Sequence, residues 1–138
     1  MRVYLDTSVY DAAWLLEERE GKLIFPEFSK FVEAAAGCMH TIIVNVYLES
    51  ELLRKYPNLA GTWEYFLKEC KSKALFVEID DDIKSKARSL VVEGVTHHPD
   101  SIHLTTAIKY ADAFVTYDRE LANAASRLIA VKRLSELI

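Results

Sequence analysis

Short apolar runs rich in β-branched residues alternate along this chain with longer stretches of helical periodicity, and no other feature restricts the fold as strongly. Such alternation is typical of a parallel sheet covered by helices. We therefore predict an α/β fold in which helices flank a central parallel sheet of four to five short strands. The predicted strands are Arg2–Leu5, Met39–Val44, Ala74–Ile79, Ala113–Thr116 and Leu128–Val131.

The stretches between these runs carry apolar residues at helical spacing. The predicted helices are Val9–Arg19, Pro26–Ala36, Val46–Tyr56, Thr62–Cys70, Asp82–Glu93, Ser101–Tyr110 and Arg119–Ser126. Gly21, Gly37 and Gly94 follow three of these helices as expected stops. Because the sequence contains no internal repeat, low-complexity tract or linker, we expect residues 1–138 to form a single domain.

Composition narrows the classes of function. The net charge is −4 and the pI ≈ 5.6, which argues against a broad basic surface for duplex DNA, so any contact with nucleic acid must be local. Cys38 and Cys70 lack C-x-x-C spacing and lie in apolar segments, which favours core thiols in a reducing compartment over zinc ligands. No signal peptide or membrane-spanning stretch is evident, and we expect a soluble cytoplasmic protein.

Three acidic residues occupy equivalent places in the predicted pattern. Asp6 directly follows the first strand, Asp118 lies just beyond the fourth, and Asp100 stands at the start of the Ser101–Tyr110 helix. Each of them can be interpreted as a helix N-cap. In a parallel sheet, however, the helix N-termini that follow the strands lie along one edge. The three carboxylates are therefore expected to converge there.

Carboxylates crowded at one edge repel one another unless a cation neutralises them. Hard oxygen ligands select Mg²⁺ or Mn²⁺. A metal so held can activate a water molecule and stabilise the charge that develops on a phosphodiester during in-line displacement. The three acids therefore indicate a nuclease that needs no Ser, Cys or His nucleophile.

A fourth acid can come from the Val46–Tyr56 helix. Its apolar stripe, Leu48 and Leu52, is flanked on opposite sides by Glu49 and Glu51, because successive residues are about 100° apart. Only one of the two can face a shared site. Helix geometry leaves the choice open, and a solvated Glu51 paired with a basic residue further along the helix is an alternative.

Three blocks carry these acids in a characteristic order. Val3 to Ser8 is a hydrophobic strand followed by Asp-Thr-Ser; Asn45 to Leu53 leads from a polar helix start to a Glu followed by Leu; and Pro99 to Asp118 contains Asp-x-x-His-x-x-x-Ala and then Ala-Asp-x-x-Val-Thr-x-Asp. The blocks span nearly the whole chain, and together they resemble the motifs of the PIN-domain ribonuclease family. The register of the second block favours Glu51 over Glu49.

The resemblance implies a three-layer PIN-like fold and a metal-dependent endoribonuclease that uses Mg²⁺ or Mn²⁺ to cut RNA. It implies an acidic site formed by Asp6, Glu51, Asp100 and Asp118. Asp6, Asp100 and Asp118 are the implied metal ligands, and Glu51 is implied to be catalytic without binding the metal. Small members of this kind resemble VapC toxins, which implies an antitoxin partner and a homodimer. Glu120 is a candidate for a further acid, which leaves one or two metals open.

Other polar residues near these blocks receive subsidiary interpretations. Thr7 and Thr116 flank the acids, and their hydroxyl groups are expected to support a carboxylate or a metal-bound water. His103 lies one helical turn from Asp100 and either orients it or has a structural role. We expect Asp11 at the surface.

Polar residues outside the three blocks have predicted roles in loops, helix caps, turns or phosphate contacts. His97 and His98 are expected in a solvated loop, the Asp80–Asp82 run is expected to cap a helix, and Asp112 is expected to satisfy a turn. The candidates for phosphate contacts are Arg54, Lys55, Lys109 and Arg119.

Two other functions compete with the nuclease. A catalytically inactive PIN-fold module that binds RNA or serves as a scaffold has the same fold without the need for metal. Haloacid-dehalogenase-like phosphatases and response-regulator receivers also place an Asp after the first strand. The phosphatase pattern requires a second Asp where this chain has Ser8, and the receiver pattern requires paired acids and a late Lys that are missing from this sequence.

Overall fold

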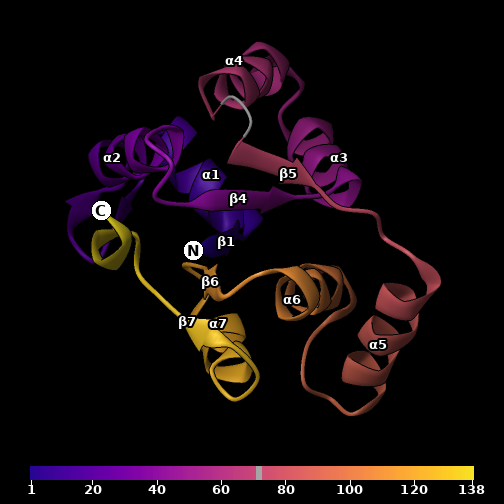
Figure 1. Cartoon of the computed structure of the whole chain (residues 1–138). Helices are drawn as coiled ribbons and strands as arrows, with labels where there is room; N and C mark the ends of the chain where they lie inside the picture. Colours follow the sequence, from indigo (N-terminus) through magenta and orange to yellow (C-terminus); the bar gives the residue numbers. More distant parts are fainter. Residues whose placement is uncertain (71–72) are drawn as a thin grey trace.

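The computed structural model describes residues 1–70 and 73–138, which contain a five-stranded parallel sheet (Figure 1). Its strands lie in the order β5-β4-β1-β6-β7, and every neighbouring pair is parallel. The predicted α/β class and the short parallel sheet are confirmed. The strand bounds are β1 Arg2–Leu5, β4 Thr41–Val44, β5 Ala74–Phe76, β6 Ala113–Val115 and β7 Ala130–Val131.

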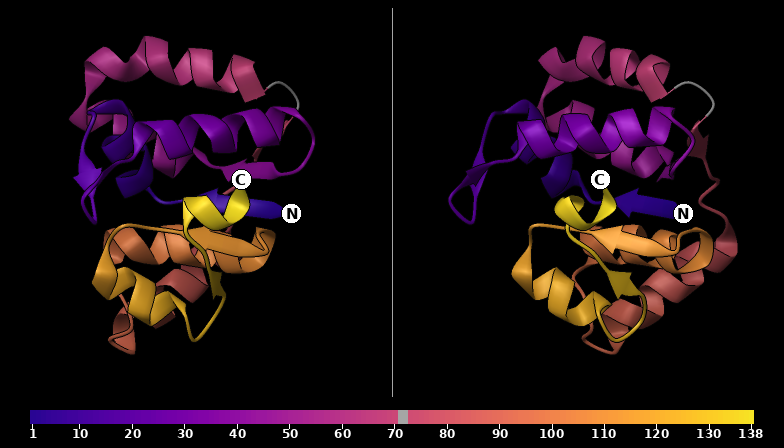
Figure 2. Two further views of the ribbon diagram at one scale, coloured as in Figure 1. Left: turned by 90° about the vertical axis from the view of Figure 1, so that its left-hand side faces the viewer. Right: turned by 60° about the vertical axis from the view of Figure 1, so that its left-hand side comes forward.

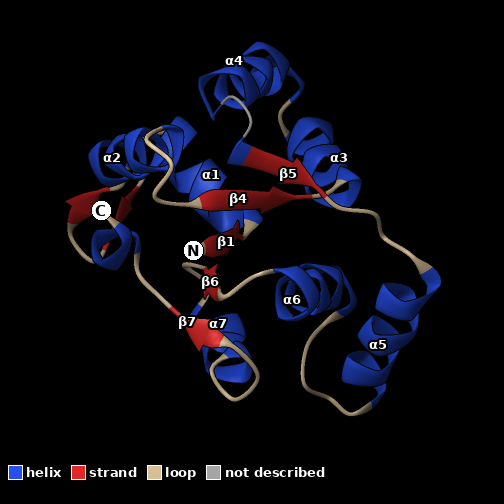
Figure 3. Cartoon of the chain, viewed as in Figure 1, coloured by secondary structure: helices blue, strands red, loops and turns tan. Residues whose placement is uncertain are grey.

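Helices occupy the connections between the strands, as Figure 3 shows in blue. Their bounds are α1 Thr7–Trp14, α2 Phe25–Ala36, α3 Val46–Lys55, α4 Ala60–Cys70, α5 Asp81–Val92, α6 His98–Tyr110 and α7 Arg119–Ala125, with 3-10 turns η1 Pro57–Leu59 and η3 Leu134–Leu137. A small antiparallel hairpin of β2 (Glu18–Arg19) and β3 (Lys22–Leu23) separates α1 from α2. No helix in the described residues is long and apolar enough to cross a membrane.

The sheet is covered on both faces because side chains alternate along each strand. Val3 and Leu5 of β1 belong to a buried cluster with residues of α1 to α4, whereas Tyr4 between them packs with Leu104 of α6 and Leu121 of α7. Figure 2 shows the purple and magenta helices on one side of the strands and the orange helices on the other. The three layers of the predicted fold are therefore present.

The first predicted helix, Val9–Arg19, is wrong in extent. The helix starts at Thr7 and ends at Trp14, because Leu16 adopts a φ of 54° and the β2–β3 hairpin follows. Gly21, at φ +76°, lies in the turn of that hairpin and does not end a helix. A left-handed backbone at this position favours glycine.

The two cysteines differ from each other. Cys70 is buried, and burial raises the pKa of its thiol to about 12. Cys38 is exposed and carries a φ of 72° directly after Gly37, where the sequence predicts a core thiol. The expectation for Cys38 is wrong because the chain turns there, between the end of α2 and the start of β4.

Asn45 joins the sheet to the helix that carries Glu51. It directly follows β4, its side chain is fully buried, and its Oδ1 accepts a hydrogen bond from the Leu48 amide at 2.8 Å as the N-cap of α3. Its Nδ2 donates to Thr106 Oγ1 of α6 at 3.1 Å. One amide therefore fixes the start of α3 and links it to α6.

We expect Asn45→Ala to lower the free energy of unfolding by about 2 kcal/mol, because a helix cap and a buried hydrogen bond are lost together. The matched control is Asp80→Ala, which removes the partly exposed N-cap of α5 together with its surface contact to Lys109 and should cost no more than about 1 kcal/mol. Urea denaturation followed by circular dichroism measures both. Equal losses in the two variants would contradict the linking role of Asn45.

Candidate active site

The candidate site lies at the C-terminal edge of the sheet, on either side of β1. Asp6 follows β1, and Thr116 and Asp118 follow β6. The connections from β1 and β4 run over one face, those from β5 and β6 run over the other, and the chain therefore changes direction between β1 and β6. Such switch points form crevices that bind ligands in parallel sheets.

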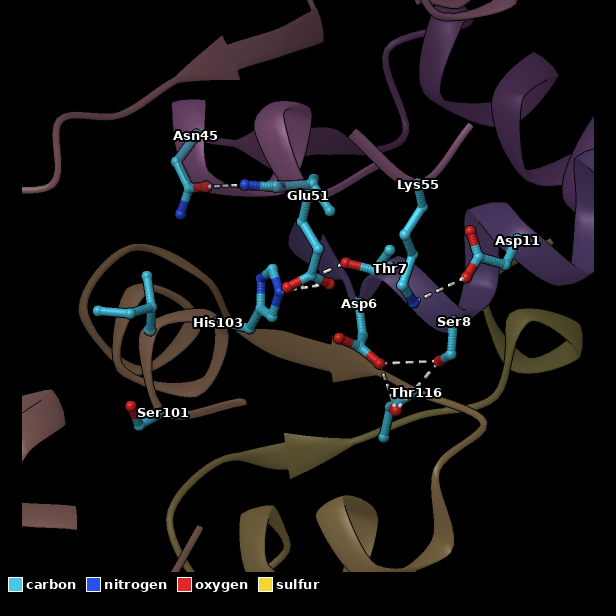
Figure 4. A network of polar contacts seen from close by, with 12 residues as sticks. Asp6, Thr7, Ser8, Asp11, Asn45, Glu51, Lys55, Ser101, His103 and Thr116 are labelled. Carbon is cyan, nitrogen blue, oxygen red and sulfur yellow. Dashed lines mark hydrogen bonds and ion pairs between the residues drawn. The ribbon is translucent and has the colours of Figure 1, made fainter. Parts of the chain in front are cut away.

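Asp6 is held in place by two hydroxyl groups. It is 5% exposed, and its Oδ2 accepts hydrogen bonds from Ser8 Oγ at 2.8 Å and from Thr116 Oγ1 at 2.9 Å. In Figure 4 the other carboxylate oxygen points away from both hydroxyls. Asp6 makes no side-chain cap for α1, so the alternative N-cap interpretation does not describe this residue.

Asp118 does cap a helix. Its Oδ1 accepts a hydrogen bond from the Leu121 amide at 3.1 Å at the start of α7, and its own amide donates to Thr116 Oγ1 at 3.1 Å. The side chain is nevertheless exposed. Thr116 is therefore bonded to both Asp6 and Asp118, on the two adjacent strand ends.

Asp100 lies in the first turn of α6, whose N-cap is His97. The helix begins three residues earlier than predicted, at His98, and Asp100 is half-buried inside it. Together with Asp118 and Glu120 it lines a pocket of ≈ 270 Å³. His97 and His98 line the same pocket and are exposed to solvent.

The pKa of Asp100 reports the convergence of the acids. Burial raises this pKa, and the charges of Asp6, Asp118 and Glu51 raise it further, while His103 lowers it. Charges act over a limited range, so the four carboxylates share one electrostatic environment. The charges of the other three acids that the sequence singles out, Asp6, Asp118 and Glu51, thus each act on the Asp100 carboxylate.

Glu49 and Glu51 face different neighbours. Glu49 Oε2 accepts a hydrogen bond from Trp63 Nε1 of α4 at 2.6 Å, so Glu49 takes part in the packing of α3 against α4. Glu51 Oε1 lies 3.4 Å from His103 Nε2, beside Thr7 (Figure 4). Of the two candidates, only Glu51 is directed toward the other acids.

The pKa of Glu51 is below its ordinary value. Burial raises it, but hydrogen bonds from His103 and Thr7 and the charges of His103 and Lys55 lower it by more. Thr7 therefore contacts Glu51 and His103 and not the neighbouring Asp6. His103 likewise contacts Glu51. Of the two alternatives for His103, the hydrogen bond to Asp100 is not among its interactions in the described residues.

Two residues near the acids differ from the sequence prediction: the position of Asp11 is predicted wrongly, and the role of Ser8 is not predicted. Asp11 is not at the surface: its side chain is 14% exposed, and it pairs with Lys55 at 3.9 Å. Burial raises the pKa of Asp11, Lys55 lowers it, and the charges of Glu17, Asp6 and Glu51 raise it. The sequence does not predict the role of Ser8, whose hydroxyl holds Asp6, although its place in the Asp-Thr-Ser motif is a signal for that role.

The basic candidates divide into those near the acids and one far from them. Lys55 lies beside Asp11 and Glu51, and Arg119 lines a groove of ≈ 380 Å³ that includes Thr116 and Asp118. The prediction that Lys109 lies near the acids is wrong, because Lys109 is in the last turn of α6 and binds Asp80 and Asp82. The basic lining of the groove is Arg19, Lys22, Arg119, Lys132 and Arg133, and its acidic lining is Glu20, Glu27, Asp118 and Glu136.

The site offers a divalent cation mainly carboxylate and hydroxyl oxygens, the ligands that suit Mg²⁺ and Mn²⁺. Within residues 1–70 and 73–138, no three Asp, Glu, His or Cys side chains stand close enough together to hold a metal ion. Asp118 is exposed and Asp100 is half-buried, so their side chains have room to rotate toward Asp6. The donor set therefore fits the metal chemically, and ligation requires side-chain movement.

Comparisons with known proteins bear on the fold. No protein-family model and no curated protein matches the sequence. A chain in the crystal structure of VapBC2 from Rickettsia felis bound to a DNA fragment from their promoter matches with a TM-score of 0.63 and 14% identity, over 96% of this chain and 98% of that one. The match shows that this chain shares its fold with a chain of that complex.

We expect Asp100→Asn to raise the Tm in metal-free buffer at pH 7 by on the order of 2 °C. Because the folded pKa of Asp100 is raised, the native state binds the proton more tightly than the unfolded chain, and stability is lost as pH rises through that pKa. The gain in Tm should therefore shrink toward pH 3, where the wild-type carboxyl is protonated.

Calorimetry at the two pH values tests this expectation. The control is Asp81→Asn, which changes an exposed acid in the first turn of α5 and should lower the Tm slightly. An unchanged or lower Tm for Asp100→Asn at pH 7 would show that the carboxylates do not repel one another.

Proposed function

We propose that this protein is a metal-dependent endoribonuclease that hydrolyses RNA phosphodiester bonds at the acidic cluster of Asp6, Glu51, Asp100 and Asp118. The observation that supports it is geometric: Thr116 is bonded to both Asp6 and Asp118 at two adjacent strand ends, and Asp118 lines one pocket with Asp100. A cluster of like charges at a strand-order switch has a cost in stability, and binding of a cation compensates that cost.

Asp6, Asp100 and Asp118 are the residues that would hold Mg²⁺ or Mn²⁺. When bound, such an ion lowers the pKa of a water molecule and stabilises charge on the phosphate. Ser8 and Thr116 keep Asp6 oriented through its Oδ2, so that its other oxygen is free to act. Glu51, which His103 contacts, contributes an ionised carboxylate that would accept a proton from the attacking water.

Lys55 and Arg119 supply positive charge beside the cluster. Lys55 Nζ is 3.9 Å from Asp11, and its side chain is 56% exposed, so it can leave Asp11 for a substrate phosphate. Arg119 follows Asp118 and lines the adjoining groove. These two residues account for local binding of RNA by a chain whose net charge is −4.

The alternative is a PIN-fold module that binds RNA or a protein without cleaving. One observation favours it, because no three acids of the described residues are in place to hold a metal. It predicts that Mn²⁺ neither binds nor changes the protein. The repulsion between the carboxylates favours the nuclease.

We also propose a protein partner, in keeping with the likeness to a chain of the VapBC2 complex, and we propose an antitoxin in that role. Large apolar side chains are exposed in the segment from the end of α1 to the start of α2, namely Leu15, Leu16, Leu23 and Phe25. A concentration of exposed apolar residues is typical of interaction surfaces. A homodimer would cover them in the absence of an antitoxin.

We expect the wild-type chain to cleave single-stranded RNA with Mg²⁺ or Mn²⁺ and to stop on addition of EDTA. Asp100→Asn and Glu51→Gln should each lower the rate by about 100-fold or more, beyond the roughly 10–100-fold effect of residues that only support metal ligands. Glu49→Gln should leave the rate within about twofold, because Glu49 binds Trp63 outside the cluster.

A gel assay on a panel of labelled RNAs measures these rates, with Asp81→Asn as a control that retains full activity. Calorimetric titration with Mn²⁺ gives binding independently of turnover. Binding of Mn²⁺ by wild type and its loss in Asp100→Asn support the proposal. RNA cleavage that persists in Asp100→Asn would exclude this mechanism.

A further inference from the structure

One histidine is buried among the elements that carry the acids. His103 is 1% exposed and lies on α6, one helical turn after Asp100. Its Nδ1 is 2.7 Å from the Tyr4 hydroxyl of β1, and its Nε2 is 3.3 Å from Thr7 Oγ1 and 3.4 Å from Glu51 Oε1. Both ring nitrogens are therefore engaged, and Figure 4 shows the ring directed at Glu51 and Thr7.

The direction of the hydrogen bonds follows from the partner of Nε2. Glu51 Oε1 belongs to a carboxylate, which accepts hydrogen bonds, so His103 Nε2 donates to it. In a neutral imidazole the other ring nitrogen then accepts, and the partner of Nδ1 at 2.7 Å is the Tyr4 hydroxyl, which donates its proton.

A histidine that accepts at Nδ1 carries its proton at Nε2 when neutral. That N–H faces the Glu51 carboxylate and the Thr7 hydroxyl. The chain of donors thus runs from Tyr4 through His103 to Glu51. Its end is the acid that the proposed function requires next to the metal-binding residues.

We propose that His103 is a positioning residue, which holds the Glu51 carboxylate toward the acidic cluster by donating from Nε2, with its tautomer set by Tyr4. The inference rests on the proposed function. It assigns to His103 a contact on α3, where the sequence suggests only Asp100 on its own helix. Three elements, β1, α3 and α6, meet at this one ring.

Packing alone does not explain the residue. The ring contacts Tyr47 at 5.4 Å and Tyr4 at 5.8 Å between centroids, contacts that an apolar side chain also provides. A buried imidazole costs free energy unless its nitrogens are bonded. In this site one of those bonds goes to Glu51, which remains 23% exposed at the site.

Two variants distinguish the role of His103 Nε2 from that of Nδ1. His103→Gln can place an amide N–H near the position of Nε2, whereas His103→Asn reaches only the position of Nδ1. We expect His103→Asn to lower kcat for RNA cleavage by about tenfold with KM unchanged, and His103→Gln to recover most of that loss. In a Glu51→Gln background, His103→Asn should have no further effect, because it acts through Glu51.

The wild-type protein without metal provides a second measurement. Long-range ¹H–¹⁵N NMR spectra should show His103 as the Nε2-protonated tautomer. Nδ1 protonation, or independent and additive effects of His103→Asn and Glu51→Gln, would overturn the proposal. If the wild-type chain cleaves no RNA, the proposed function fails, and the tautomer still decides whether His103 donates to Glu51.

Discussion

Repulsion among carboxylates at one sheet edge is the constraint that organises this molecule. Each acid is held by a different part of the chain: Asp6 by the hydroxyls of Ser8 and Thr116, Asp118 by the backbone of α7, and Glu51 by His103. The pKa of Asp100 is raised, first by burial and then by the charges of Asp6 and Asp118. A chain selected for stability alone has no reason to gather these charges, which is why the cluster is informative about function.

The layered fold and the edge of the sheet were predictable because they follow from local patterns. Apolar strands with β-branched residues predict a parallel sheet, and parallel strands place the residues after β1 and β6 together. The end of α1 was not predictable, since it depends on Leu16 adopting a left-handed conformation before the hairpin. The apolar periodicity of the sequence continues through Leu16 and gives no sign that the helix ends before it.

Tertiary contacts account for what the sequence left open at the site. The choice between Glu49 and Glu51 depends on Trp63, which lies on the following helix and occupies Glu49. Helical spacing relates His103 to Asp100, but the orientation of α6 against α3 directs its ring to Glu51. Asp11 is half-buried for a similar reason, because Lys55 of α3 packs over it. Local sequence patterns predict which residues lie together on one helix or strand, but they do not predict contacts between different elements.

The contrast between the two thiols has a practical consequence. Cys38 is exposed in the turn that leads into β4, at the opposite end of the strands from the acids, whereas Cys70 is buried with a thiol pKa of about 12. Alkylating reagents reach the exposed Cys38 and leave the buried, protonated thiol of Cys70 intact. A fluorophore or spin label can therefore be attached to the unmodified sequence at one defined point, and ligands added at the far edge can be followed without altering the residues of that edge.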